Sequence, residues 1–125
     1  MKILLLMGLA GFFGTLARHF SVRAVNHLLP GFPWGTLCVN VAGAFLAGFL
    51  FIWGREKFQE YEHFMPIIFI GFLGAFTTFS TFALESARFF MDGQYSKMLL
   101  NIALQNITGL AAAICGIWVC NTLTK

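Results

Sequence analysis

Four long apolar segments, separated by short polar or turn-forming stretches, make up most of the chain. They cover about residues 3–25, 34–53, 66–90 and 97–121. A helix of roughly 20 apolar residues is long enough to cross the hydrocarbon core of a bilayer. The pattern therefore predicts an all-α membrane protein with four transmembrane helices in a single transmembrane domain, residues 1–125.

The separators between the segments carry ordinary boundary signals. Pro30, Gly31 and Pro33 form a turn signal after the first segment, and Asp92 and Gly93 form another before the last. Residues 54–63 are the most charged stretch and are expected to be a solvated loop. An even number of segments places both termini on the same side of the membrane.

Small and hydroxyl-bearing residues interrupt the middle of the third segment. The run from Gly71 to Phe82 includes two glycines and four hydroxyl side chains, which are Thr77, Thr78, Ser80 and Thr81. At membrane depth, irregular backbone is tolerated only where protein buries it or water reaches it. We therefore expect a helix that is broken near Gly74 and that lines an ion path. The alternative is that the hydroxyls bond back to carbonyls of their own helix.

Composition narrows the class of protein. The chain is 58% hydrophobic and 10% charged, with a mean hydropathy of +0.79, which is typical of a lipid bilayer as the surrounding medium. The net charge of +3 is small and scattered, so nucleic acid is not an expected partner. We find no metal-ligand pattern among the cysteines, no Ser/His/Asp spacing and no phosphate-binding loop, so the protein is not expected to be an enzyme.

Basic residues are divided equally between the two sides of the membrane. The side with the termini holds Lys2, Arg55, Lys57 and Lys125. The other side holds Arg18, Arg23, Arg88 and Lys97. Because an excess of Lys and Arg normally sets orientation, an equal division predicts insertion both ways. We expect a dual-topology protein that forms an antiparallel homodimer.

Two kinds of transport fit a four-helix protein of this size. A small dual-topology, proton-coupled exporter of organic cations needs a membrane-buried carboxylate. The acidic residue within a segment is Glu85, at the spacing of an ion pair with Arg88. The available donors suit an anion better, since Asn40 offers amide N–H groups and a broken helix exposes backbone N–H groups. Freed carbonyls at such a break could hold a cation.

Phenylalanines accompany the hydroxyl groups. Phe76, Phe79 and Phe82 share one helix face. Packing against lipid is the usual role of such a stripe. Because ring edges carry partial positive charge, a small dehydrated anion could also pass along them.

Three motifs resemble those of the Fluc (CrcB) family of fluoride channels. They are Gly11-Phe12-Phe13-Gly14 followed by Arg18, Pro33-Trp34-Gly35-Thr36-Leu37 followed by Asn40, and Gly71 to Phe82 followed by Glu85. The resemblance implies a fluoride-selective passive channel in the cell inner (plasma) membrane. It would export fluoride down its gradient and protect the cell from fluoride toxicity.

The resemblance also implies an assembly and residue roles. The assembly is an antiparallel homodimer with two pores and a structural Na⁺ at the dimer interface, held by backbone carbonyls of Gly74 and Thr77. The implied fluoride-pore residues are Asn40, Phe79, Phe82 and Ser80. Arg18 is expected at the pore entrance, where it would attract anions.

The fourth segment departs from the family pattern. Members of the family often carry hydroxyls spaced by four along this helix. Counted from Gly109 and Gly116, that face here would hold Asn106, Leu110 and Ile114. Either the polar series is shortened to Asn106, which is then a pore residue, or Gln105 and Thr108 substitute from a neighbouring face.

Overall fold

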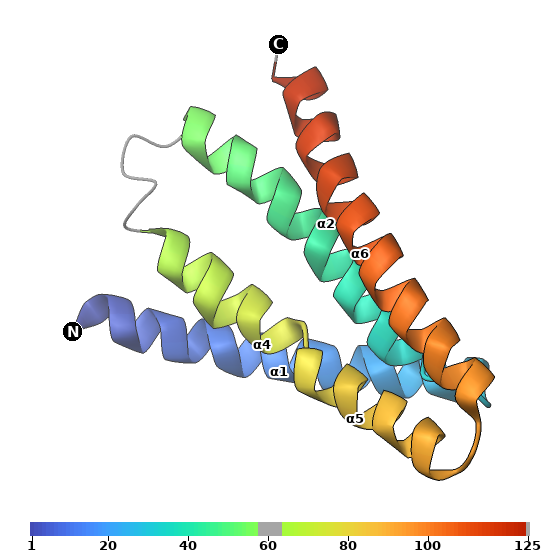
Figure 1. The fold of residues 1–125 in the computed structure, drawn as a ribbon. Coiled ribbons are helices and arrows are strands. Elements are labelled where there is room, and N and C mark those ends of the chain that lie inside the picture. Colours follow the sequence, from blue (N-terminus) through green and yellow to red (C-terminus); the bar gives the residue numbers. More distant parts are fainter. Residues whose placement is uncertain (58–63, 125) are drawn as a thin grey trace.

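The structure is a computed structural model that describes residues 1–57 and 64–124, and each regular element in these ranges is helical. The elements are α1 (Lys2–Leu28), α2 (Trp34–Lys57), η1 (Pro66–Leu73), α4 (Gly74–Phe76), α5 (Phe79–Met91) and α6 (Tyr95–Leu123) (Figure 1). The stretches long and apolar enough to cross a membrane are Lys2–Leu28, Trp34–Glu56, Pro66–Met91 and Tyr95–Leu123. The prediction of an all-α protein with four such helices, the third of them bent, is confirmed. The assignment of residues 1–125 to a single domain stays a prediction.

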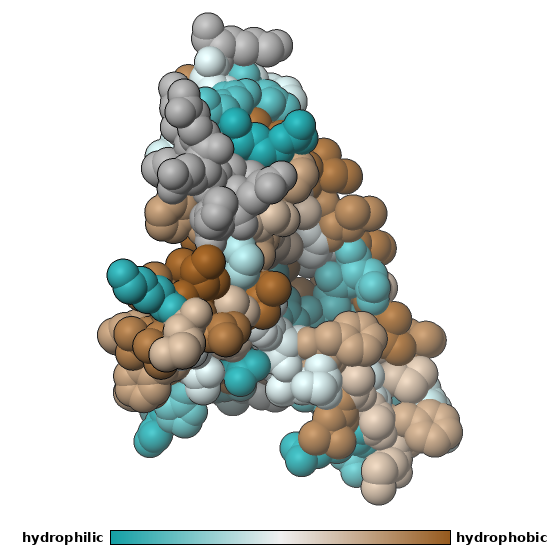
Figure 2. Space-filling view, turned by 90° about the vertical axis from the view of Figure 1, so that its left-hand side faces the viewer, coloured by the Kyte–Doolittle hydropathy of each residue, from teal (hydrophilic) through white to brown (hydrophobic). Residues whose placement is uncertain are grey.

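The helices associate in two pairs. The helix α1 packs along η1 and α4, and α2 packs along α6. Figure 1 shows the two pairs diverging from the end of the molecule at which α5 turns into α6, with both termini at the open ends. Figure 2 shows hydrophobic side chains over much of one face and hydrophilic ones beside a hollow near its middle.

Glycines allow the first pair of helices to approach closely. A Cβ atom at Gly14 would collide with the carbonyl oxygen of Phe72, and one at Gly11 would lie 3.6 Å from the carbonyl oxygen of Gly71. Small residues at such positions let backbones pack together in the membrane. A Cβ at Gly8 would meet no described atom within 4 Å, so the contact face includes Gly11 and Gly14 but not Gly8.

In the second pair, both α2 and α6 contribute a glycine to the close contact. A Cβ at Gly48 of α2 would collide with the carbonyl of Ala113, and one at Gly116 of α6 would collide with the carbonyl of Phe45. The two backbones therefore touch over adjacent turns, which fixes α6 against α2. This contact sets the register of the polar side chains that the two helices present to each other.

Both predicted turns are present. Gly31 and Gly93 have φ values of +93° and +69°, which residues with a side chain rarely adopt. After the first turn, Asn26 of α1 accepts a hydrogen bond from the Gly35 N–H at 2.7 Å and so caps the start of α2. The helix α2 continues to Lys57, into the stretch expected to be a loop, and the rest of that stretch, residues 58–63, lies outside the described residues.

The break in the third helix lies at Thr77 and Thr78. Residues 66–73 form a π-helix, and one α-helical turn, α4, follows it. Thr77 (φ −90°, ψ 160°) and Thr78 (φ −153°, ψ 117°) are then extended, and α5 begins at Phe79. Gly74 is itself helical (φ −62°, ψ −32°), so the break lies slightly beyond the expected position.

Candidate functional site

The peptide at the break is held by Asn40, which lies in the first third of α2. The Asn40 amide nitrogen donates to the Thr78 carbonyl oxygen at 3.0 Å, and the Thr78 N–H donates to the Asn40 carbonyl oxygen at 2.8 Å. The Asn40 carboxamide thus donates one hydrogen bond to the backbone of Thr78 and accepts one from it, as a paired residue of a neighbouring β-strand would. Because unpaired backbone groups are costly at membrane depth, this clamp lets the helix break there.

The hydroxyl groups begin the next helix. Thr78 Oγ1 accepts from the Thr81 N–H at 3.2 Å and donates to Thr81 Oγ1 at 3.0 Å, and it lies 3.4 Å from Ser80 Oγ. Thr78 is therefore the N-cap of α5. Thr77 Oγ1 instead donates to the Leu73 carbonyl of its own helix at 2.8 Å, as the alternative interpretation has it.

These side-chain bonds leave two backbone carbonyls without their helical partners. In a continuous helix, Gly74 O would accept from the Thr78 N–H and Thr77 O from the Thr81 N–H. Both N–H groups donate to side chains instead, those of Asn40 and Thr78. Arg18 Nη1 donates a long hydrogen bond to Thr77 O, at 3.5 Å.

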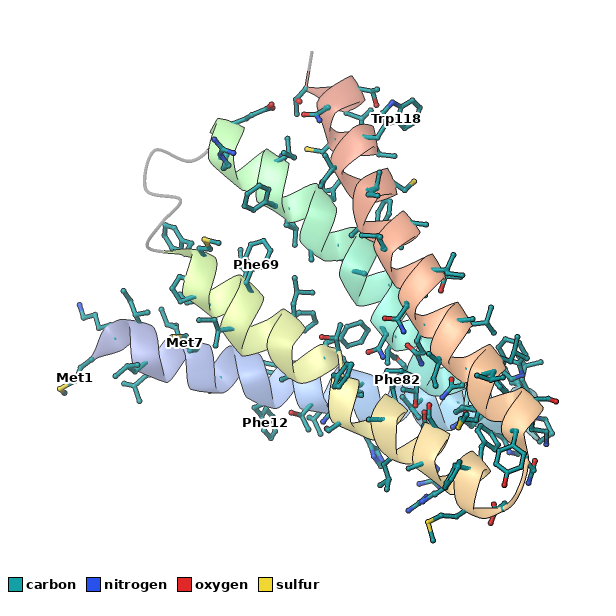
Figure 3. The ribbon with its side chains drawn as sticks, in the orientation of Figure 1. Met1, Met7, Phe12, Phe69, Phe82 and Trp118 are labelled. Atoms are coloured by element: carbon teal, nitrogen blue, oxygen red, sulfur yellow. The ribbon has the colours of Figure 1, made fainter. Side chains whose placement is uncertain are left out.

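A cavity of about 400 Å³ lies beside the break. It brings together predicted site residues from three segments of the chain, namely Asn40, Gly74, Thr77, Phe79, Phe82 and Asn106. Phe82 is 8% exposed and Phe79 is 77% exposed, and their rings meet edge to face with centroids 5.3 Å apart. Figure 3 shows Phe69 and Phe82 pointing into the space between the helix pairs, whereas Phe12 and Trp118 point away.

A second cavity, of about 390 Å³, lies on the other side of Thr78. Its lining includes Arg18, His19, Arg23, Thr36, Thr81 and Glu85. Thr78 lines both cavities. The residue expected at the pore entrance, Arg18, therefore lies in a different cavity from the phenylalanines. Ser80 is exposed and is not among the residues that line either cavity.

The polar face of α6 differs from the face counted along the sequence. Gln105 is buried, and its Oε1 accepts a hydrogen bond from the Asn40 amide nitrogen at 3.0 Å. Asn106 is exposed at the edge of the first cavity and donates to the Ile102 carbonyl at 2.7 Å. Thr108 donates to the Leu104 carbonyl of its own helix. Of the two proposed substitutes, Gln105 reaches the cavity and Thr108 is not among its lining residues.

Sequence reasoning missed Asn101 altogether. Asn101 is fully buried, and its amide nitrogen donates to Ser86 Oγ at 3.0 Å, which links α6 to α5. Both Asn101 and Gln105 lie on the buried face that also includes Gly116. A helix repeats every 3.6 residues, so counting back from Gly116 by whole turns reaches Gln105 and then Asn101, not Asn106.

Glu85 accepts a hydrogen bond that its spacing does not predict. Thr36 Oγ1 donates to Glu85 Oε1 at 2.6 Å, and Thr36 is fully buried. Arg88, the residue expected to pair with Glu85, is exposed. The Thr36 contact ties α2 to α5 beside the second cavity.

Three buried polar atoms have no hydrogen-bond partner among the described residues. They are Gln105 Nε2, Asn101 Oδ1 and Glu85 Oε2. Leaving a buried donor or acceptor unsatisfied costs about 1–3 kcal/mol. Such groups in a native structure are commonly explained by a bound ion or water.

Comparison with known proteins connects this geometry with one family. Residues 5–117 match the family described as CrcB-like protein, Camphor Resistance (CrcB). A protein of Solidesulfovibrio magneticus named "Fluoride-specific ion channel FluC" is 41% identical over 112 residues, 89% of this chain and 90% of that protein. Proteins of the same name from Hydrogenovibrio crunogenus (41% over 117 residues, 92% and 88%) and Campylobacter lari (38% over 117 residues, 93% and 92%) are also similar.

Proposed function

The chain belongs to the CrcB family, and we propose that it is a fluoride-specific ion channel. It is a multi-pass membrane protein, and its relatives are named as ion channels rather than enzymes. The channel is passive: it lets fluoride leave the cell down its gradient through the inner membrane and so protects the cell from fluoride toxicity. The observation that supports this most is the cavity at the helix break, which combines aromatic rings with the amide side chains of Asn40 and Gln105.

The lining of this cavity suits a small anion that must lose its water. Moving an unpaired charge into an apolar medium is prohibitive, so a selective path has to replace the hydration shell with donors. The rings of Phe79 and Phe82 meet edge to face, and ring edges carry partial positive charge. Amide and hydroxyl side chains, those of Asn40, Gln105 and Thr78, line the same cavity as the rings.

The second cavity fits an entrance for anions. Arg18 and Arg23 line it, and positive side chains in a concave site raise the local concentration of anions. The N-terminus of α5 lies between this cavity and the first, and helix N-termini favour negative charge. In this proposal fluoride enters beside Arg18, passes Thr78 at the break and reaches Phe79 and Phe82. Ser80 adds an exposed hydroxyl close to Thr78.

Efflux from liposomes tests the function. Vesicles loaded with potassium fluoride and containing the purified protein should release fluoride once a potassium ionophore balances the charge. Release should need no proton gradient, and vesicles loaded with chloride should stay tight. If adding an organic cation to vesicles that contain the protein instead causes proton movement across their membrane, the protein is a small proton-coupled exporter, with Glu85 as its carboxylate. Release of chloride as fast as fluoride would contradict fluoride selectivity.

We expect the working unit to be an antiparallel homodimer with two pores. The equal division of basic residues supports insertion in both orientations. Phe79 lines the first cavity and Thr81 the second, and both are exposed in the single chain, so a second copy could close the path.

A structural sodium ion at the dimer interface fits the freed carbonyls of Gly74 and Thr77. Unwound backbone carbonyls in a broken membrane helix are typical ligands for Na⁺. Both oxygens lose their helical donors to the side chains of Asn40 and Thr78. Arg18 approaches Thr77 O, but a carbonyl has a second lone pair. When bound, the ion would supply positive charge beside the break.

The assembly is tested in two steps. Reporters fused to the C-terminus should give signals from both sides of the membrane, and a signal from one side alone would refute dual topology. In detergent, the purified protein should migrate as a dimer in sodium and lose dimer when sodium is replaced by a bulky organic cation. A dimer that is indifferent to this exchange would remove the sodium from the proposal and leave the orientation result intact.

A further inference from the structure

We infer that Ser86 and Asn101 are positioning residues for fluoride conduction, because together they connect the backbone of Phe82 to α6. Neither is among the described residues that line the two cavities, so they act through Phe82 and not on the ion. This role rests on the proposed function.

Two buried hydrogen bonds lead from α6 to the carbonyl of Phe82. Ser86 Oγ donates to Phe82 O at 3.0 Å, and the Asn101 amide nitrogen donates to Ser86 Oγ at 3.0 Å. A hydroxyl has one hydrogen to donate and lone pairs with which to accept, so Ser86 makes both bonds at once. Away from water such bonds are stronger, and one polarises the next. The position of α6 is thereby transmitted to the backbone of Phe82.

The segment of α5 that carries the two phenylalanines is connected to α6 at both of its ends. At the N-terminal end, Thr78 bonds to Asn40, and Asn40 bonds to Gln105 of α6. At the other end, Ser86 bonds to Asn101, which lies about one helical turn before Gln105. The extended peptide before α5 interrupts the helix, so the rotation of α5 about its axis has to be fixed by contacts with other helices. The contact of Ser86 is the one that reaches the Phe82 carbonyl.

The rotation of α5 determines which part of the Phe82 ring faces the cavity. The ring is buried, lines the first cavity and meets Phe79 edge to face, with the ring centroids 5.3 Å apart. The edge of an aromatic ring carries partial positive charge and its face partial negative charge. A small rotation that turns the face toward the path therefore replaces attraction for an anion by repulsion. Conduction depends on this orientation more steeply than the stability of the fold does.

The contact between Ser86 and Asn101 is not needed merely to hold α5 against α6. Asn101 is fully buried, and its Oδ1 has no hydrogen-bond partner among the described residues. Replacing both partners of a buried polar pair by apolar groups of the same shape is often nearly neutral or stabilising. Apolar side chains would therefore serve packing equally well, and an experiment can separate positioning from stability.

Two variants of the same shape test the hydroxyl of Ser86. Ser86→Thr keeps the hydroxyl, and Ser86→Val removes it at nearly the same volume. Fluoride efflux from vesicles containing Ser86→Val should be about tenfold slower than with Ser86→Thr, because a small misplacement of a contacting group is costly. Thr108→Val is the matched control and should conduct as wild type, because the Thr108 hydroxyl bonds to a carbonyl of its own helix. Equal efflux from Ser86→Thr and Ser86→Val would overturn the inference.

A double variant separates positioning from stability. Ser86→Ala combined with Asn101→Leu removes both polar partners together, so its melting temperature should stay within a few degrees of wild type or rise. Its efflux should nevertheless fall about tenfold, since Phe82 loses its connection to α6. Wild-type efflux from the double variant would overturn the positioning role, and so would a loss of efflux no larger than the loss of folded protein.

A second combination tests whether the effect passes through Phe82. In a Phe82→Ile background the ring edge is absent, so Ser86→Val should slow the residual efflux by less than about twofold. A further tenfold loss would show that Ser86 acts elsewhere and would overturn the inference. Absence of fluoride efflux from the wild-type protein would refute the proposed function instead.

Discussion

Replacing Phe82 by isoleucine should almost abolish fluoride efflux while leaving the folded protein intact. The Phe82 ring is 8% exposed, lies in the first cavity and meets Phe79 edge to face. Isoleucine fills most of the same space but has no partially positive edge. An ion contact worth about 3 kcal/mol that is not replaced slows passage about 100-fold, because each 1.36 kcal/mol is a factor of ten.

Stability should change much less than conduction. Exchange of one buried apolar side chain for another of similar volume typically costs less than about 1.5 kcal/mol. Phe82→Ile should therefore purify in the same oligomeric state as wild type and melt a few degrees lower at most. Phe79→Ile should also lose conduction, with an even smaller effect on the stability of the single chain, because Phe79 is 77% exposed.

Phe12→Ile is the matched control for these variants. Phe12 is exposed on α1, and Figure 3 shows it pointing away from the helix pairs, so the same substitution there changes only an outward contact. Its efflux should equal that of wild type. Wild-type efflux from both Phe79→Ile and Phe82→Ile would remove the rings from the mechanism, whatever the control shows.

The helices could be predicted from the sequence because lipid imposes a simple rule. A span needs a long apolar segment, and the lengths of the apolar runs therefore determine α1, α2 and α6 closely. The break in the third helix was also foreseeable, since glycines and hydroxyls gather there. Its position at Thr77 and Thr78 was not, because Asn40 supplies the bonds that stabilise the extended peptide from 38 positions away in the chain. Local sequence does not encode that contact.

The site was predictable only in part for the same reason. Asn40, Phe79 and Phe82 stand out in the sequence, and the structure brings them to one cavity. Gln105 was open as an alternative and Asn101 was missed, because the buried face of α6 depends on how Gly48 and Gly116 interlock α2 with α6. A shift of one residue along α6 turns the face by about 100°, which exchanges Gln105 for Asn106. The ligands of sodium, the role of Ser80 and the dimer stay predictions.

Asn40→Asp should impair conduction as severely as the loss of a ring. The carboxylate can still accept from the Thr78 N–H, but it cannot donate to the Thr78 carbonyl or to Gln105. Both partners then face a negative charge, and the Thr78 carbonyl and Gln105 Oε1 lose their donor. The anion path would thus acquire a repelling charge, and the clamp on the break would be weakened. We expect efflux at pH 7.5 to fall at least about 100-fold, which corresponds to about 2.7 kcal/mol.

Asn26→Asp is the matched control for this change. Asn26 uses its side-chain oxygen to accept from the Gly35 N–H, and a carboxylate keeps that role at the start of α2, where negative charge is favourable. Its efflux should be close to wild type.

A double variant tests the contact between Asn40 and Gln105. In a Gln105→Met background, Asn40→Asp should slow fluoride efflux by a smaller factor than it does alone, because part of its effect acts through Gln105. Fully additive losses would mean that the two amides act independently, and undiminished efflux from Asn40→Asp would remove Asn40 from the path.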